Sequence, residues 1–415
     1  AHVGHPTNME PQTNYDESAV PSYELPDPLI DAAGNPVATA ADWQSRRRPE
    51  ILRLFEDEVY GRMPGPFESS HTEILDEDPG ALGGRAVRRQ TRLRFGDDET
   101  SPAMDLLLYL PSEATGPTRV FLGLNFFGNH SIHTDPGIRL STEWMQSSKS
   151  NQIVDHRATE ASRGVFASRW PVADILARGY GLATIYCGDL DPDFDDGYAN
   201  GVHPLFYQDG QTQPEPHQWG SISAWAWGLS RGLDVLEEDD AVDAAHVAVM
   251  GHSRLGKTAL WAGACDERFA LVISNNSGCG GAALARRRFG ETVAAINGNF
   301  PHWFCDNHRA YNDCEDELPV DQHQLIALAA PRPVYVASAI DDQWADPKGE
   351  YLASRHASPV YELLGQRELD AQQMPPVSQP LADGSIGYHV RPGGHDVTTY
   401  DWNRWMDFAD RHWRG

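Results

Sequence analysis

The stretch His246-Val-Ala-Val-Met-Gly-His-Ser-Arg-Leu-Gly-Lys257 joins a short apolar run to a turn and to the start of a helix. Residues 247–250 are apolar and rich in β-branched side chains, which predicts a buried strand, and residues 254–264 have a helical composition. Ser253 stands at the turn between them. A serine on a sharp turn that links a strand to a helix is the arrangement of a nucleophile elbow.

The elbow needs a glycine two positions before the serine, because the turn forces the serine into a strained backbone conformation. Gly251 fills that position. The pattern G-x-S-x-G places a second glycine two residues after the serine, but Leu255 stands there and Gly256 comes one residue later. A serine between a strand and a helix is also a common N-cap, so this motif alone leaves both interpretations open.

Two later strands lead into the other residues that a serine nucleophile requires. The strand predicted at 333–339 runs into Asp341 and Asp342, and the strand predicted at 386–391 runs into His395. Serine, acid and histidine thus follow one another in the order of the α/β-hydrolases. Because the carboxyl ends of parallel strands meet at one edge of a sheet, we predict a catalytic triad there.

Of the two aspartates, Asp342 fits the acid better, because this acid usually stands four residues along from the small residue that ends the strand, counting Ala339 as the first. Asp341 remains the alternative. Taken alone, His395 also fits a turn histidine bonded to the backbone, and the aspartates also fit a solvated pair.

The chemistry assigns a role to each residue of the predicted triad. His395 takes the proton of Ser253, which makes the hydroxyl a competent nucleophile. Asp342 fixes the imidazole tautomer and stabilises the imidazolium that forms. The backbone N–H of Arg254, the residue after the nucleophile, is expected to meet the oxyanion, and its guanidinium adds positive charge nearby.

Strands and helices alternate from residue 120 onward, which predicts a parallel sheet with helices on both faces. We therefore expect an α/β protein, a three-layer α/β-hydrolase, with one catalytic domain at 41–415. Residues 1–40 predict an extended surface segment, and residues 128–168 an insertion over the carboxyl edge that walls the substrate groove. Further strands are predicted at 86–95, 104–110, 120–127, 181–187 and 269–274, and helices at 170–177, 219–236, 282–296, 351–364 and 402–413.

Charge and composition limit the partners. Lys and Arg number 33 against 60 Asp and Glu, which gives a net charge of −27. A chain this acidic repels nucleic acid and anionic membrane surfaces, so we expect neither as a partner. The sequence has no apolar run long enough for a membrane-spanning helix. The polar, Pro-rich start of the chain predicts a mature secreted or periplasmic protein, and we expect a monomer.

Two groups of residues resemble metal sites only in part. The stretch Asp191-x-Asp193-x-Asp195 begins like a calcium loop but lacks the glycine and the glutamate that such a loop requires. Four residues lie at weak zinc spacing without a C-x-x-C pair: His302, Cys305, His308 and Cys314. A disulfide between those two cysteines is an equal alternative. We expect no metal and no other cofactor.

The elbow and several other motifs resemble those of the glucuronoyl esterases, carbohydrate esterase family 15, in their bacterial branch. Residues 251–257 read GHSRLGK and are similar to the family signature G-C/H-S-R-x-G-K. Further matching motifs lie at 123–129, 189–197, 225–229, 275–281 and 342–347. The resemblance implies hydrolysis of the ester between 4-O-methyl-glucuronic acid on xylan and a lignin alcohol, without a metal.

The resemblance also assigns roles to single residues. It matches Arg254 to an oxyanion residue, and the elbow serine and His395 to nucleophile and base. It assigns sugar-binding roles to three residues: Lys257, Glu291 and Trp344. Many family members carry the catalytic acid as glutamate where this chain has Asn276, and an amide cannot balance an imidazolium. The acid must then be Asp342, as in family members with an acid at this later site.

Other interpretations stay open from the residues alone. Lys257 also fits an exposed helix lysine, Glu291 a surface helix acid, and Trp344 a residue packed in the core. Two other functions are alternatives: a carbohydrate acetyl esterase acting on xylan, and a catalytically silent hydrolase fold that only binds polysaccharide.

Overall fold

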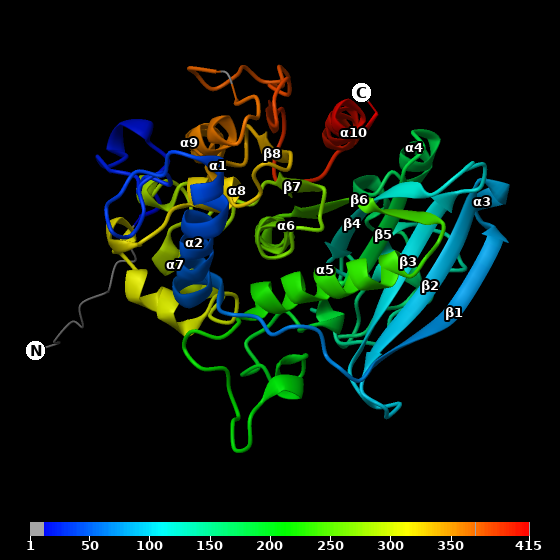
Figure 1. Cartoon of the computed structure of the whole chain (residues 1–415). Helices are drawn as coiled ribbons and strands as arrows, with labels where there is room; N and C mark the ends of the chain where they lie inside the picture. The colour runs from blue at the N-terminus through cyan, green and yellow to red at the C-terminus, as the bar shows by residue number, and fades with distance from the viewer. Residues whose placement is uncertain (1–11, 370, 415) are drawn as a thin grey trace, which may run out of the picture.

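The computed structural model of the chain describes residues 12–369 and 371–414. Within these residues, nine strands form one sheet in the order β1-β2-β3-β5-β4-β6-β7-β8-β9 (Figure 1). The strands are β1 Ser70–Gly80, β2 Ala86–Phe95, β3 Ala103–Pro111, β4 Thr118–Asn125, β5 Gly181–Tyr186, β6 Val242–His252, β7 Leu271–Asn275, β8 Val334–Ala339 and β9 Ile386–Arg391. Strands β5, β4, β6, β7, β8 and β9 pair in parallel, whereas β1, β2 and β3 form an antiparallel extension that joins β5.

Helices cover both faces of the sheet. They are α1 Ala40–Asp42, α2 Arg48–Phe55, α3 Ala81–Gly84, α4 Val172–Ala177, α5 Ser221–Glu237, α6 Arg254–Cys265, α7 Val293–Asn299, α8 Gln322–Ala327, α9 Pro347–Leu363 and α10 Thr399–Trp413. Along β6, Val247 and Val249 enter the core cluster shared with α5 and α6, whereas Ala248 and Met250 enter the cluster shared with α4 and α10. Figure 1 shows these two helix pairs on opposite sides of the sheet. The predicted three-layer α/β architecture is confirmed.

The sequence does not predict β1, which lies at the edge of the sheet. This strand is largely exposed and polar, so it lacks the apolar alternation that marks a half-buried strand. Ion pairs hold it to β2 instead: Asp76 with Arg88, and Glu77 with Arg89. Opposite charges across neighbouring strands favour pairing, but they can be recognised only once the partner strand is known.

The helix predicted at 282–296 is wrong over most of its length, because only its last residues belong to α7. Arg286 and Arg287 are buried in this segment. The first hydrogen-bonds Asp321 and the second Asp346, both distant in sequence. These buried ion pairs hold the segment in an irregular path and outweigh its helical composition.

Two segments outside the regular elements border the functional edge. In residues 12–39, the helical element that the structure describes is the 3-10 turn Glu17–Ala19. Residues 128–168 contain short 3-10 turns and otherwise irregular chain, and they pack at the carboxyl ends of β4 and β5, where the Tyr186 hydroxyl donates to the carbonyl of Trp144 at 2.7 Å. In residues 12–369 and 371–414, no helix is both long and apolar enough to cross a membrane.

Candidate active site

The elbow places Ser253 between β6 and α6 with φ 60° and ψ −128°, a strained conformation for a residue with a side chain. Gly251 cannot carry a side chain, because a Cβ there would lie 1.9 Å from the backbone oxygen of Leu255. Gly256 lets α6 approach the loop after β7, since a Cβ there would lie 3.0 Å from the Cβ of Ser277. Gly256, one residue after the position that the motif expects, therefore allows close packing of α6 against this loop.

The three predicted triad residues come together at the carboxyl edge of the sheet. The Nε2 atom of His395 lies 2.9 Å from the Oγ of Ser253. Its Nδ1 atom lies 2.7 Å from the Oδ2 of Asp342, a buried carboxylate. Asp341 is exposed, and its backbone N–H binds the carbonyl of Gly393. The carboxylate that contacts the imidazole is thus that of Asp342.

A buried cation fixes the loop that carries His395. The guanidinium of Arg391 donates to the carbonyls of Gly394 (3.1 Å) and Asp396 (2.6 Å), on either side of the histidine. It also donates to Asp401 at 2.8 Å, and His389 donates to the same carboxylate at 2.8 Å. Burial alone raises the pKa of Asp401, but His389 and Arg391 outweigh it and hold that pKa below its ordinary value. The sequence does not predict this network, and its one signal there is an arginine at the end of a buried strand.

We expect Arg391→Met to lower the free energy of unfolding by about 3 kcal/mol, because it leaves the buried Asp401 carboxylate without its cation. We also expect kcat to fall about a hundredfold, because a loop that shifts by an ångström misplaces the imidazole. Urea unfolding and ester turnover measure the two effects. The control Arg411→Gln removes an exposed cation paired with Asp383 and should change stability by less than about 0.5 kcal/mol. Equal stability of the two variants would contradict the role of the network.

His252 lies beside the triad histidine, with its ring centroid 4.5 Å from that of His395. Asn275 contacts its Nδ1 at 3.0 Å. Burial, and next the neighbouring His395, hold the pKa of His252 well below its ordinary value. His252 therefore packs against His395 as a neutral ring.

The side chain of Arg254 is held in a fixed position next to the elbow. Its guanidinium forms an ion pair with Asp193 and lies 4.7 Å from the ring centroid of Trp303. Asp193 also accepts hydrogen bonds from His302 (2.8 Å) and Trp303 (2.9 Å). Burial raises the pKa of Asp193, yet His302, Arg254 and Trp303 together lower it to about 2. This aspartate is therefore negatively charged near neutral pH, and it orients Arg254.

Lys257 is buried on α6 and does not project as an exposed helix lysine. Its ammonium donates to the backbone carbonyl of Ser277. Burial lowers the pKa of Lys257, and the nearby carboxylate of Glu291 opposes this shift. The side chain thus places a donor one helical turn beyond the elbow serine, on the same face of α6.

Glu291 and Trp344 lie together at the rim of the site, near Lys257. Glu291 precedes α7 instead of lying in a helix, and its backbone N–H donates to the carbonyl of Trp344 at 3.0 Å. Burial raises the pKa of Glu291, while Lys257 and Arg254 oppose the shift. Trp344 is 39% exposed, so it is not a core residue. The three residues to which the resemblance assigns sugar contacts therefore lie close to one another and to the elbow.

The partial metal motifs have other roles. Asp193 is the partner of Arg254, and the Asp191 carboxylate accepts a hydrogen bond from Ser221. All five cysteines are free thiols, so no disulfide joins Cys305 and Cys314. Among the described residues, no three His, Cys, Asp or Glu side chains are grouped so as to hold a metal ion.

Comparison with known proteins identifies the family. The family model described as "Glucuronyl esterase, fungi" matches residues 206–365. "Carbohydrate esterase MZ0003", from an unknown prokaryotic organism, is 54% identical over 403 residues, which cover 97% of this chain and 92% of that protein. The solved structure of a promiscuous CE15 esterase from a marine bacterial metagenome is 53% identical, with a TM-score of 0.91, covering 97% of this chain and 100% of that one. The chain belongs to carbohydrate esterase family 15.

A second solved structure supports the assignment. The glucuronoyl esterase from Solibacter usitatus is 49% identical, with a TM-score of 0.90, and the match covers 95% of this chain and 100% of that one. The resemblance seen in the sequence motifs is thereby confirmed, and the chain is a carboxylic ester hydrolase of the CE15 type.

Asn276 stands where the resemblance implies a catalytic glutamate in many family members. Its side chain is buried, and its Nδ2 donates to the backbone carbonyl of Asp396 at 3.3 Å, as Asn275 does at 3.0 Å. An amide can donate to this carbonyl, whereas a carboxylate would repel it. Asn276 therefore supports the chain next to His395, and the imidazole contacts Asp342 instead.

The N-terminal segment contacts and stabilises the part of the site that carries Glu291 and Trp344. The buried guanidinium of Arg287 donates to two carboxylates, Glu17 (3.0 and 2.7 Å) and Asp346 (2.8 and 3.1 Å). The backbone N–H of Gly290 also donates to the carbonyl of Asn14 at 2.9 Å. Gly290 precedes Glu291, and Asp346 follows Trp344 by two residues. The segment therefore stabilises the chain next to both side chains.

We expect Glu17→Gln to lower the free energy of unfolding by about 0.5–1 kcal/mol near neutral pH, since this carboxylate is partly exposed and solvent screens it. The hydrogen bond from Arg287 lowers the pKa of Glu17 from 4.5 to about 2. The wild-type advantage is therefore complete above pH 4.5 and shrinks as the pH falls towards 2. Urea unfolding of both proteins at several pH values measures it. Glu24→Gln, on the same segment, is the control, and a difference that grows on acidification would contradict the assignment.

Proposed function

We propose that this enzyme hydrolyses the ester between (4-O-methyl-)glucuronic acid of glucuronoxylan and a lignin alcohol. The observation that carries the proposal is the chain of contacts from Ser253 through His395 to Asp342, at 2.9 and 2.7 Å, on a strained elbow. The family membership and the polar side chains around this elbow narrow the ester to one of a uronic acid.

Ser253, His395 and Asp342 would act through an acyl-enzyme. His395 accepts the proton of Ser253 at Nε2 while the serine Oγ attacks the ester carbonyl carbon. The tetrahedral intermediate then collapses, and the alcohol leaves with the proton that His395 returns to it. A water, deprotonated by the same imidazole, hydrolyses the acyl-enzyme to the free uronic acid and restores Ser253.

Arg254 would stabilise the oxyanion. Its backbone N–H is the first of α6, where helix N–H groups have no intrahelical partner and point outward. Loss of one such donor typically costs about 3 kcal/mol of transition-state stabilisation. Because Asp193 and Trp303 already fix the guanidinium, its charge requires no reorganisation during the reaction.

The acyl side of the substrate would contact Lys257, Glu291 and Trp344. Lys257 and Glu291 offer one donor and one acceptor to sugar hydroxyls, and the exposed face of Trp344 suits the C–H bonds of a pyranose ring. A uronic acid esterified at its carboxyl group carries no charge, so the net charge of −27 does not repel it.

Turnover of two substrates tests the proposal. We expect release of benzyl alcohol from benzyl glucuronate, with little acetate released from acetylated xylan. The opposite pattern would favour the acetyl esterase alternative. Absence of both activities, with xylan affinity equal in wild type and Ser253→Ala, would favour a silent polysaccharide-binding fold.

The polymeric substrate also bears on where and how the enzyme works. Glucuronoxylan lies outside the cell, so we place the enzyme in the periplasm or in the extracellular medium, acting as a monomer without nucleic acid or membrane partners. Light scattering of the purified protein tests the oligomeric state, and fractionation of producing cells tests the location.

A further inference from the structure

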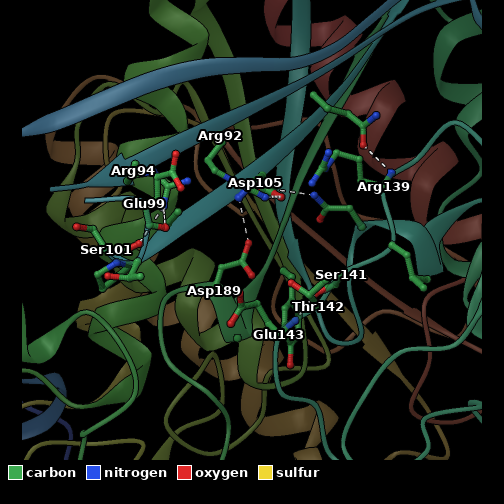
Figure 2. Close-up of a pocket in the computed structure, with 18 of the residues that line it drawn as sticks. Arg92, Arg94, Glu99, Ser101, Asp105, Arg139, Ser141, Thr142, Glu143 and Asp189 are labelled. Atoms are coloured by element: carbon green, nitrogen blue, oxygen red, sulfur yellow. Dashed lines mark hydrogen bonds and ion pairs between the residues drawn. The ribbon is translucent and has the colours of Figure 1, made fainter. Parts of the chain in front are cut away.

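A cavity of about 500 Å³ opens at the same edge of the sheet as the triad. Arg92 and Arg94 of β2 and Asp105 of β3 line one side, and Asp189 follows β5 (Figure 2). Residues 139–143, from the irregular segment after β4, line the other side. No triad residue and none of the proposed sugar contacts belongs to this lining.

The cavity lies at a definite place relative to the elbow. In the sheet order, β5 is two strands from β6 and β2 is four, so at about 4.8 Å per strand the cavity lies roughly 10–19 Å from the elbow strand. One loop connects both sites: Asp189 lines the cavity, and Asp193 holds Arg254. The ring of Trp144 packs on Phe194 of this loop with centroids 4.3 Å apart. An oligosaccharide of several sugar units spans this distance, and it must cross over β6, because Glu291 and Trp344 follow β7 and β8 on the other side of that strand.

The side chains on the strand side of the cavity are fixed by hydrogen bonds. Arg92 binds Asp105 through two hydrogen bonds of 2.7 and 2.8 Å. Arg94 donates to the backbone carbonyls of Glu99 (2.6 Å) and Ser101 (3.3 Å). The groups that face the cavity are therefore positioned before any ligand binds, which reduces the entropy cost of binding.

The opposite side supplies adaptable donors and acceptors. Arg139 is exposed, and in the described part of the chain its guanidinium has no carboxylate partner. Ser141, Thr142 and Glu143 follow it along the wall (Figure 2). Donors and acceptors thus both line the cavity, as the hydroxyls of a sugar require.

The charges of the lining nearly cancel. Arg92, Arg94 and Arg139 face four carboxyl groups, those of Glu99, Asp105, Glu143 and Asp189. Burial, and next the charge of Asp105, raise the pKa of Asp189, which favours its neutral form. A lining without excess positive charge, on a protein of net charge −27, does not select an anion. It suits an uncharged polyhydroxylated ligand.

We propose that this cavity is a second carbohydrate subsite, which binds uncharged sugar units of the polysaccharide main chain whose glucuronate ester is cleaved at Ser253. The inference rests on the proposed function for the identity of that polysaccharide. The proposal assigns a function to the segment 128–168, because residues 139–143 of this segment form one wall of the subsite.

Calorimetric titration with xylohexaose, an uncharged main-chain fragment, tests the subsite without turnover. We expect wild-type binding to weaken about tenfold in Thr142→Trp, which fills the cavity, and about fivefold in Arg139→Ala, which removes donors. Arg157→Ala is the matched control, because Arg157 is exposed on the same segment but does not line the cavity. Its affinity should equal that of wild type.

Kinetics supply the second measurement. The ratio of kcat/KM for a benzyl-esterified glucuronoxylo-oligosaccharide to that for benzyl glucuronate should fall about tenfold in Thr142→Trp and stay at the wild-type value in Arg157→Ala. The subsite would be overturned if wild type and Thr142→Trp bound xylohexaose equally well, or if wild type did not bind it. The proposed function would still stand in that case if the enzyme hydrolysed benzyl glucuronate. If the cavity bound oligosaccharides that carry glucuronate but did not bind xylohexaose, the subsite for uncharged sugar units would also be overturned. Failure to hydrolyse benzyl glucuronate would reject the proposed function, and the titration would still test the subsite.

Discussion

Ser253→Ala is expected to lower kcat for benzyl glucuronate by about a millionfold, the scale seen when a serine hydrolase loses its nucleophile. The alanine has no oxygen to form the acyl-enzyme, and the remaining rate comes from the oxyanion donors and from substrate positioning. KM should change little, because the proposed sugar contacts at Lys257, Glu291 and Trp344 remain. Release of benzyl alcohol measures the rate.

A matched control separates loss of the nucleophile from general damage. Ser45→Ala removes an exposed serine whose hydroxyl donates to a helix carbonyl far from the triad in sequence. We expect wild-type turnover from it. Activity of Ser253→Ala within about tenfold of wild type would show that another group attacks the ester.

Asp342→Asn is expected to lower kcat about ten-thousandfold while the fold stays intact. An amide facing the Nδ1 of His395 at the present 2.7 Å would donate to it, which selects the wrong imidazole tautomer and leaves the imidazolium without a counter-charge. Near-UV circular dichroism checks the fold, and the turnover of benzyl glucuronate reports the loss.

Asp341→Asn provides the comparison, because it makes the same chemical change one residue earlier. Asp341 is exposed, so we expect turnover within about twofold of wild type. Loss of activity in Asp341→Asn with normal activity in Asp342→Asn would transfer the role of the acid and contradict the geometry of the triad.

The features that the sequence predicts well are local ones. The apolar run before Ser253 predicts a buried strand from its composition, and the glycine at 251 is required by short-range sterics at the turn. The order of serine, acid and histidine, each after a strand, then limits the sheet to a parallel arrangement with one functional edge.

The features that the sequence does not predict depend on distant partners. Residues 282–296 have helical composition, yet buried ion pairs of Arg286 and Arg287 with Asp321 and Asp346 impose another path. The support of His395 by Arg391 and the fastening of the rim by Glu17 likewise join segments far apart in the chain. Composition and periodicity do not indicate such pairs.

The sequence by itself determined the elbow, the parallel sheet and the family, because turn sterics, strand periodicity and motif spacing are written in consecutive residues. Only the tertiary structure decided which aspartate contacts the imidazole, that Lys257 is buried rather than solvated, and that a polar cavity opens at the same edge of the sheet as the triad. Those properties arise from desolvation and from long-range contacts, and both depend on how separate segments pack against one another.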